Sequence, residues 1–380
     1  MSEVTRNTPA IDDEEILFGI RGWVEIETPS PDGEAVNRLA DVVQSEATAL
    51  GGRVERIPGR DGYGDILTVR SPWGGDEPGI LILSHLDTVH AVGTLEFANP
   101  FRRDGDRVYG PGIFDMKSGA YLAFYAFQHL VRSGQETPLP LTFLYVPEEE
   151  IGSPTSRQVI EDTAQKNKYV LVTEPAHNGL CCTARKGVLH VDMKVYGRPA
   201  HAGSRHQDGR SALRELAHQI VTLESLTDYE RGITVNVGLA SGGSFINVVP
   251  AEAEAKVCIR APETEQLEAL KEHVLALQTD DTDVKLEITA EVNRPVFPRL
   301  EGTVELFKHA REICRKIGFD LEERHSGGGS DGNFTAALGI PTLDGLGADG
   351  HGHHTQDEYI LFSSLKPRAR MWVQLLQTLT

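Results

Sequence analysis

Histidine and carboxylate side chains recur in this sequence just after short, continuous apolar runs. Four such runs, at residues 80–83, 141–146, 169–172 and 341–343, are followed by acidic or histidine residues, the last across a glycine-rich loop. Together with the glycine-rich segment at 110–117, they supply His85, Asp87, Asp115, Glu149, Glu150, Glu174 and His354. Continuous apolar runs are typical of buried parallel strands, and ligands bind beyond the carboxyl ends of such strands. We therefore expect these side chains to meet at one edge of a sheet.

A bound metal ion is the simplest explanation for histidine and carboxylate side chains that lie close together. Carboxylates crowded together repel one another unless a cation lies among them. Histidine with carboxylate, and no cysteine, suits zinc or a similar first-row metal better than calcium. Each segment alone has an ordinary interpretation: the acids at 148–150 could form a solvated loop, and the histidines at 351–354 an exposed tract. Because each segment ends a different predicted strand or enters a different helix, their combination favours a metal centre.

The spacing of the acids also suggests supporting roles. Asp87 lies two residues beyond His85, and a metal-ligating imidazole usually donates its other N–H to a carboxylate, which fixes the ring and its tautomer. The neighbouring pair Glu149 and Glu150 allows one carboxylate to bind metal while the other acts as a general base toward water. We therefore expect Asp87 to orient His85, and one of the two glutamates to move protons.

The elements that must position these groups follow two patterns. Before about residue 185 and after residue 293, apolar runs alternate with helical spacing. One helix is predicted from Ser118, with apolar residues every three or four positions before a C-capping Gly134, and another around 304–314. This alternation predicts an α/β domain with a mainly parallel sheet covered on both faces.

The middle of the chain shows a different pattern, in which apolar and polar residues alternate strictly. Such alternation is typical of antiparallel strands with one solvated face. Strands and helices follow in the order β-α-β-β-α-β of a ferredoxin-like unit, at 189–195, 213–223, 233–239, 253–259, 267–277 and 284–288. We expect residues 186–292 to form an α+β domain inserted between two parts of the catalytic domain, 1–185 and 293–380.

Composition excludes several classes of function. The chain of 380 residues has 37 basic and 56 acidic residues, a net charge of −19, and no basic run that would favour nucleic acid as a partner. We expect no membrane span, because uninterrupted apolar stretches stay far below about 18 residues. The polar, acidic first 15 residues do not resemble a signal peptide, and four cysteines, two of them adjacent, do not suggest a disulfide framework. We expect a cytoplasmic protein.

Six motifs together resemble the co-catalytic metallopeptidase family that includes glutamate carboxypeptidase, acetylornithine deacetylase, succinyl-diaminopimelate desuccinylase and aminoacylase. They are SHLDTV at 84–89, GPGIFDMKSG at 110–119, EEEIGSPTSR at 148–157, TEPA at 173–176, GRPAHAG at 197–203 and HTQDEY at 354–359. The similarity extends over nearly the whole chain, and its spacing looks most like the glutamate carboxypeptidase branch. The inserted domain would then serve as a lid and a dimerisation domain.

The resemblance implies a set of metal ligands. Asp115 would bridge two zinc ions per chain, for which cobalt or manganese could substitute. His85 and Glu174 would complete one site, and Glu150 and His354 the other. The peptide bond after the bridging aspartate, Asp115–Met116 here, would be cis.

The resemblance also implies a reaction and a substrate. Glu149 would be the general base, Asp87 would orient His85, and His201 of the inserted domain would polarise the scissile carbonyl, supplied by the partner chain of a homodimer. The substrate would be an N-acyl amino acid or short peptide with a free carboxylate next to the scissile amide. The positions matching the substrate-carboxylate site are Asn247, Arg260 and Arg294, and the segment 327–332 matches a loop on the substrate side.

Some alternatives stay open in the sequence. His351 or His353 could replace His354 as the ligand, although HTQDEY fits the family pattern best at His354, and Glu148 stands where the family usually has aspartate. Deacylases of the acetylornithine or succinyl-diaminopimelate type and dipeptidases share the same machinery. A different class, an inactive metal-binding scaffold with the inserted domain as an interaction module, is disfavoured because the general base and all five ligands occur together.

Overall fold

The computed structural model describes residues 10–279 and 281–380, which form two compact units. The first unit runs to Ala184 and includes Arg299–His325 and Ser330–Thr380. The second comprises Arg185–Pro298 and the short segment Ser326–Gly329, which was not expected to group with it. The predicted inserted domain, 186–292, falls within the longer segment. The signal-peptide prediction concerns a stretch of which residues 1–9 lie outside the described residues.

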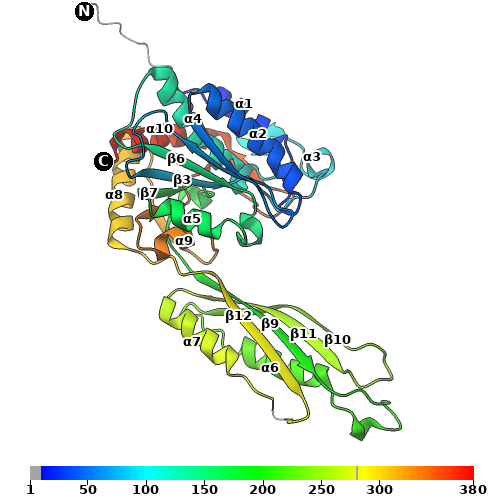
Figure 1. The fold of residues 1–380 in the computed structure, drawn as a ribbon. Helices are drawn as coiled ribbons and strands as arrows, with labels where there is room; N and C mark the ends of the chain where they lie inside the picture. The colour runs from blue at the N-terminus through cyan, green and yellow to red at the C-terminus, as the bar shows by residue number, and fades with distance from the viewer. Residues whose placement is uncertain (1–9, 280) are drawn as a thin grey trace, which may run out of the picture. The chain divides into compact units, whose positions relative to one another are not determined.

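A six-stranded sheet forms the centre of the first unit (Figure 1). Its strands, in spatial order, are β1 (Arg53–Ile57), β2 (Ile66–Arg70), β6 (Leu141–Val146), β3 (Gly79–His85), β7 (Asn167–Val172) and β14 (Thr342–Leu343). The four strands from β6 to β14 are parallel, while β2 runs antiparallel to both β1 and β6. The mainly parallel sheet is confirmed. The pair β1 and β2 was not predicted, because β1 alternates between exposed and half-buried residues instead of forming a continuous apolar run.

Both faces of this sheet are buried, which explains the unbroken apolar runs. In β3, Ile80 and Ile82 belong to one hydrophobic core, and Leu81 and Leu83 to another on the opposite face. The larger core contains residues from α1 (Asp13–Val24), α2 (Gly33–Ala49), α4 (Ser118–Ser133), α8 (Glu301–Ile317) and α10 (Phe362–Thr378). The smaller core contains residues from α5 (Arg157–Ala164) and α9 (Gly332–Ala337).

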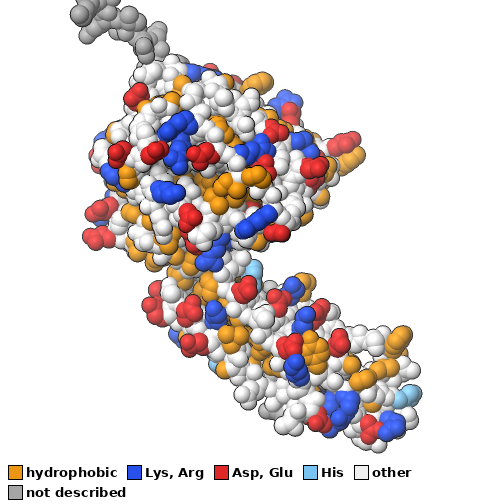
Figure 2. All heavy atoms as spheres, viewed as in Figure 1, with side chains coloured by type: hydrophobic (Ala, Val, Ile, Leu, Met, Phe, Trp, Pro, Cys, Tyr) orange, Lys and Arg blue, Asp and Glu red, His pale blue; other side chains and the backbone are white. Residues whose placement is uncertain are grey.

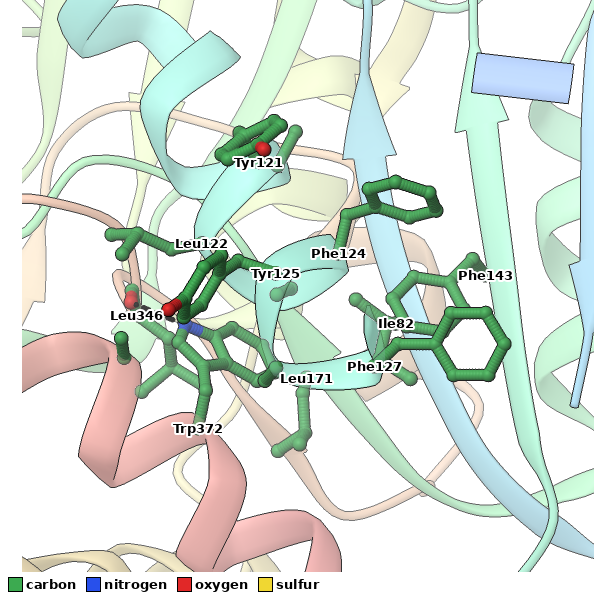
Figure 3. Close-up of a cluster of buried hydrophobic side chains, with 14 of the residues drawn as sticks. Ile82, Tyr121, Leu122, Phe124, Tyr125, Phe127, Phe143, Leu171, Leu346 and Trp372 are labelled. Atoms are coloured by element: carbon green, nitrogen blue, oxygen red, sulfur yellow. Dashed lines mark hydrogen bonds between the residues drawn. The ribbon is translucent and has the colours of Figure 1, made fainter. Parts of the chain in front are cut away.

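Helix α4 lies at the centre of the larger core (Figure 3). Phe124 and Phe127 pack against Phe143 of β6, with ring centroids 6.5 and 5.5 Å apart. Trp372 of α10 is fully buried and donates from its indole Nε1 to the carbonyl of Leu346 at 3.0 Å. The helix ends at Gly134 in the left-handed conformation, as predicted. This packing fixes the start of α4, and therefore the segment just before it that carries Asp115.

The second unit has the ferredoxin-like order that the alternation predicted. Its elements are β9 (Gly187–Tyr196), α6 (Ala212–Glu224), β10 (Thr234–Gly242), β11 (Glu252–Ala261), α7 (Thr264–Leu275) and β12 (Lys285–Arg294). The antiparallel sheet has the strand order β10-β11-β9-β12. Alternate residues of β9, from Leu189 to Val195, pack with residues of both helices in one core. The other face of the sheet carries charged side chains such as Asp192 and Lys194.

Several short elements complete the first unit. A small antiparallel sheet is formed by β4 (Arg102–Asp104), β5 (Arg107–Tyr109), β15 (Gly350–His351) and β16 (Tyr359–Leu361). The remaining elements are α3 (Thr94–Phe97), β8 (Cys181–Arg185) and β13 (Glu323–Ser326), of which β8 and β13 pair. Two of these elements, β8 and β13, end in residues that are assigned to the second unit.

The surface carries side chains of both charges. Basic and acidic side chains are interspersed over the face that Figure 2 shows. Among residues 10–279 and 281–380, no helix combines the length and the apolar character that crossing a bilayer requires. All four cysteines are free thiols.

Candidate metal centre

The predicted ligands occupy the carboxyl ends of the parallel strands. His85 is the last residue of β3, and Glu174 lies two residues beyond the end of β7. Glu149 and Glu150 begin a short 3-10 turn after β6. Asp115 lies in the turn Ile113–Lys117 that leads into α4, its own backbone is not helical (φ −114°, ψ 93°), and the peptide bond from Asp115 to Met116 is cis. His354 comes from the loop between β15 and β16.

The two carboxylate oxygens of Asp115 point to two different histidines. Its Oδ1 lies 3.3 Å from Nε2 of His85, and its Oδ2 lies 3.3 Å from Nε2 of His354. On the first side, Oε1 of Glu174 is 3.8 Å from the same His85 nitrogen. On the second side, Oε2 of Glu150 is 2.9 Å from the same His354 nitrogen. The five residues thus form two groups, each with one histidine and one glutamate, that share Asp115.

Burial and crowding strongly perturb the ionisation of this cluster. Burial, with the charge of Asp115, raises the pKa of Glu150 to about 8 and also raises the pKa of Glu174. Burial alone would raise the pKa of Asp115, but its contacts with His354 and His85 lower it overall. Contacts with Asp115 and Glu150 raise the pKa of His354 to about 11. The pKa of His85 is raised by Asp115 and Asp87 although its burial opposes this. A bound cation would stabilise the charged form of these crowded carboxylates better than water does.

The donor set fits divalent metal ions. Oε1 of Glu150 is buried and accepts no hydrogen bond from any described residue. Ligand atoms of His85, Asp115 and Glu150 lie within 4.8 Å of one another, as do those of His85, Glu149 and Glu174. An unsatisfied buried carboxylate oxygen is costly unless a metal or a donor meets it. Imidazole and carboxylate ligands without thiolate suit zinc and its first-row neighbours.

Asp87 has a wider role than the sequence suggested. Its carboxylate is fully buried and accepts the backbone N–H groups of Glu149 at 3.1 Å and Glu150 at 3.2 Å, as well as the hydroxyl of Ser30 at 2.6 Å. Nδ1 of His85 is nearer to the backbone carbonyl of Asp87, at 3.0 Å, than to its carboxylate, at 3.4 Å. Asp87 therefore orients the ring mainly through its main chain, and its side chain holds the two glutamates in place.

The structure separates the three candidate histidines at 351–354. Among the described residues, His354 is the one of the three that forms ion pairs with Asp115 and Glu150. The His353 ring packs edge-on against His177, with centroids 4.6 Å apart, and His351 is an exposed residue of β15. This arrangement favours His354 as the ligand. His354 has a φ of 61°, in the left-handed region that side chains other than glycine seldom adopt.

Two residues near the ligands were not predicted. Glu358 is completely buried and accepts hydrogen bonds from the backbone N–H groups of Gly112, Phe114 and Asp115. His90 approaches the same carboxylate at 2.6 Å. Glu358 lies within the HTQDEY motif, but nothing in the sequence distinguishes a buried acceptor from a solvated acid at that position. The signal available in the sequence was its place in that motif, four residues after His354.

The residues predicted to bind the substrate carboxylate belong to the second unit and the predicted metal ligands to the first, while the predicted loop 327–332 is divided between the two units. Arg260 donates from Nη1 to the carbonyl of Gly327 at 2.7 Å and makes no ion pair with Glu263 within the described chain. Asn247 is exposed, while Arg294 is only 3% exposed. The depth of Arg294 makes it a weaker candidate for direct contact with a substrate than Arg260.

His201 is exposed, and the contacts of its ring determine its tautomer. Nδ1 accepts the backbone N–H groups of Gly203 and Ser204, both at 3.1 Å. In the neutral ring, the proton must therefore reside on Nε2, which faces away from these donors. The neutral His201 ring can therefore donate a hydrogen bond from Nε2.

Comparisons with known proteins identify the family of this chain. Residues 81–378 match the model of peptidase family M20/M25/M40. The chain is 30% identical to carboxypeptidase G2 of Pseudomonas sp. (strain RS-16), over 96% of this chain and 89% of that protein. Two solved structures share the fold. A tripeptidase of Staphylococcus aureus has a TM-score of 0.79 at 21% identity, covering 97% of this chain and 99% of its own.

The second of these structures is a metallo-carboxypeptidase of the M20 family from Sulfolobus solfataricus. Its TM-score is 0.76 at 19% identity, and it covers 97% of this chain and 99% of its own. The matched family region contains every predicted metal ligand and all six motifs. The chain therefore belongs to peptidase family M20/M25/M40 and is a metal-dependent hydrolase.

Proposed function

We propose that this chain is a two-zinc hydrolase that cleaves an amide bond next to a free carboxylate, in an N-acyl amino acid or a short peptide. The observation that carries the proposal is the position of Asp115, whose two oxygens face His85 and His354 separately. A carboxylate in this position can bridge two metal ions, one with His85 and Glu174 and the other with His354 and Glu150. Cobalt or manganese could occupy the same ligands.

Metal ions at this site would polarise the substrate carbonyl and make water more acidic. Glu149 would take the proton from the attacking water and then deliver it to the leaving amine. Its main chain is held by Asp87, which keeps it next to the proposed ligand Glu150. His201 would donate from Nε2 to the developing oxyanion, because its Nδ1 is already occupied by two backbone donors.

Arg260 with Asn247 would bind the substrate carboxylate. Only one of the five guanidinium N–H groups is used by the carbonyl of Gly327, so others are available for a planar, two-point contact. Arg294, which is buried, would support this region rather than touch the substrate. Deacylases and dipeptidases would use the same metal ligands and base, so they differ from the main proposal only in the groups on either side of the amide.

We further propose a homodimer in which His201 serves the active site of the partner chain. The strand β10 lies at the edge of its sheet, and exposed apolar side chains accompany it, Leu239 at 65% and Phe245 at 73% exposure. An edge strand with such side chains favours pairing with another copy, and twofold dimers are the commonest assembly. The alternative is that His201 only stabilises its own turn.

A cytoplasmic location is also proposed. Support comes from the four free cysteines, three of them buried, which are typical of a reducing compartment.

The first prediction concerns metal stoichiometry. Protein saturated with zinc should hold two ions per chain, because five ligands sharing one aspartate exceed the needs of one tetrahedral zinc. Elemental analysis after removal of free metal measures this. Asp115→Ala should lose both ions. A value that stays at one or below in the wild type would contradict the two-metal proposal.

The second prediction separates the two neighbouring glutamates. Glu149→Gln should lower kcat by about 10²–10⁴-fold or more while both metals stay bound, because the amide cannot accept the proton of water. Glu150→Gln should instead weaken metal binding. Turnover and metal content are measured on the same preparations. If Glu149→Gln loses the metals and Glu150→Gln keeps them, the two roles are exchanged.

The third prediction concerns the substrate carboxylate. Converting the free carboxylate of an N-acyl amino acid into an amide should lower kcat/KM by about 10–100-fold, the range expected for loss of a charge-assisted hydrogen bond. Arg260→Lys should lower kcat/KM for the acid but not for the amide. Arg231→Lys, an exposed arginine of the same unit, serves as the control. Equal kcat/KM values for acid and amide would exclude a carboxylate requirement.

The fourth prediction tests the shared active site. Glu149→Gln and His201→Ala should each be inactive alone, but co-expression should restore about a quarter of the wild-type activity. Random pairing makes about half of the dimers hybrid, and each hybrid has one intact site of two. Two different affinity tags allow the hybrid to be purified. An inactive purified hybrid would show that the sites are not shared between chains.

A further inference from the structure

The buried carboxylate of Glu358, near the proposed ligands, meets four donors from segments far away in the chain. Its side chain has no exposed surface, and each of its two carboxylate oxygens has two hydrogen-bond partners. Oε1 accepts the backbone N–H groups of Phe114 and Asp115, both at 2.8 Å. Oε2 accepts the backbone N–H of Gly112 at 2.9 Å and faces Nε2 of His90 at 2.6 Å. A buried carboxylate with four donors is rigidly held and holds its donors rigidly in return.

These donors come from segments that carry metal ligands. Gly112, Phe114 and Asp115 belong to the turn that presents the bridging carboxylate. His90 lies in the loop that follows β3 and His85, and Glu358 itself comes four residues after His354. One carboxylate therefore connects the chain segments of His85, Asp115 and His354.

A second buried glutamate, Glu148, accepts its hydrogen bonds from residues nearby in the chain, so hydrogen bonds to distant segments are not a general feature of buried acids in this protein. Glu148 is also fully buried and accepts from the backbone and hydroxyl groups of Thr155 and Ser156. Those partners are only seven or eight residues away, so Glu148 stabilises its own loop. The partners of Glu358 are 243 to 268 residues away, so its bonds determine how separate ligand segments meet.

We propose that Glu358, oriented by His90, is a positioning residue that sets the place of Asp115 for metal binding. It touches neither metal nor substrate, and it acts through the backbone N–H of Asp115 and its neighbours. This inference rests on the ligand set of the proposed function. Groups that hold metal ligands typically change metal affinity by about 10–100-fold when they are replaced.

Glu358→Gln is the direct test, because it keeps the size of the side chain but replaces one acceptor oxygen by an NH₂ group that faces other donors. Zinc affinity is measured by competition with a chromophoric chelator, on the full-length protein, and should fall about 10–100-fold. Thermal unfolding of the metal-free protein is recorded in parallel. Asp65→Asn is the matched control: Asp65 accepts from Arg56 and from the N–H of Gly59, so its loss should lower the unfolding temperature without changing zinc affinity.

Variants of His90 supply a second test of the positioning role, which can still be carried out if Glu358→Gln does not fold. The amide nitrogen of a glutamine can occupy nearly the place of imidazole Nε2. His90→Gln should therefore keep zinc affinity near that of the wild type, while His90→Ala should weaken it.

Wild-type zinc affinity in Glu358→Gln, whatever its unfolding temperature, would overturn the inference, and so would wild-type affinity in His90→Ala. If the wild type itself holds fewer than two zinc ions, the proposed function fails first. Two bound ions with unchanged affinity in the variants would remove only the positioning role.

Discussion

Repulsion among buried carboxylates is the constraint on which this structure depends. Asp115, Glu150 and Glu174 are brought together with little solvent around them, and burial with mutual repulsion raises the pKa values of the two glutamates. Two histidines offset part of this charge but leave Oε1 of Glu150 without a partner among the described residues. Divalent cations would satisfy these oxygens, which explains why an acidic cluster can persist in a folded domain.

The fold brings the cluster together through ordinary packing. Parallel strands end at the same edge of a sheet, so His85, Glu150 and Glu174 become neighbours although they are far apart in the chain. Asp115 needs a different mechanism, because it precedes a helix. The aromatic core around α4 fixes the helix, and the turn before it is held by Glu358. The hydrophobic core and the proposed metal centre therefore share one structural element.

The buried acids divide into two kinds by their hydrogen bonds. Asp87, Glu148 and Glu358 are each fully buried and accept backbone N–H groups together with a hydroxyl or an imidazole. The proposed ligands instead face histidines and one another. Carboxylates that are satisfied by protein donors hold the framework, and those that are not remain available to metal. This difference in bonding, rather than a difference in residue type, separates the supporting acids from the proposed ligands.

The sequence by itself determined the buried parallel strands, the ferredoxin-like unit and the segments that end in candidate ligands, because periodicity and burial are local properties of the chain. It could not choose among His351, His353 and His354, since that choice depends on which ring turns toward Asp115. It also missed the role of Glu358 and the edge pair β1 and β2, and it could not show that Arg294 is buried. These features depend on contacts between residues far apart in the chain, and only the tertiary structure decides which donors meet a given side chain.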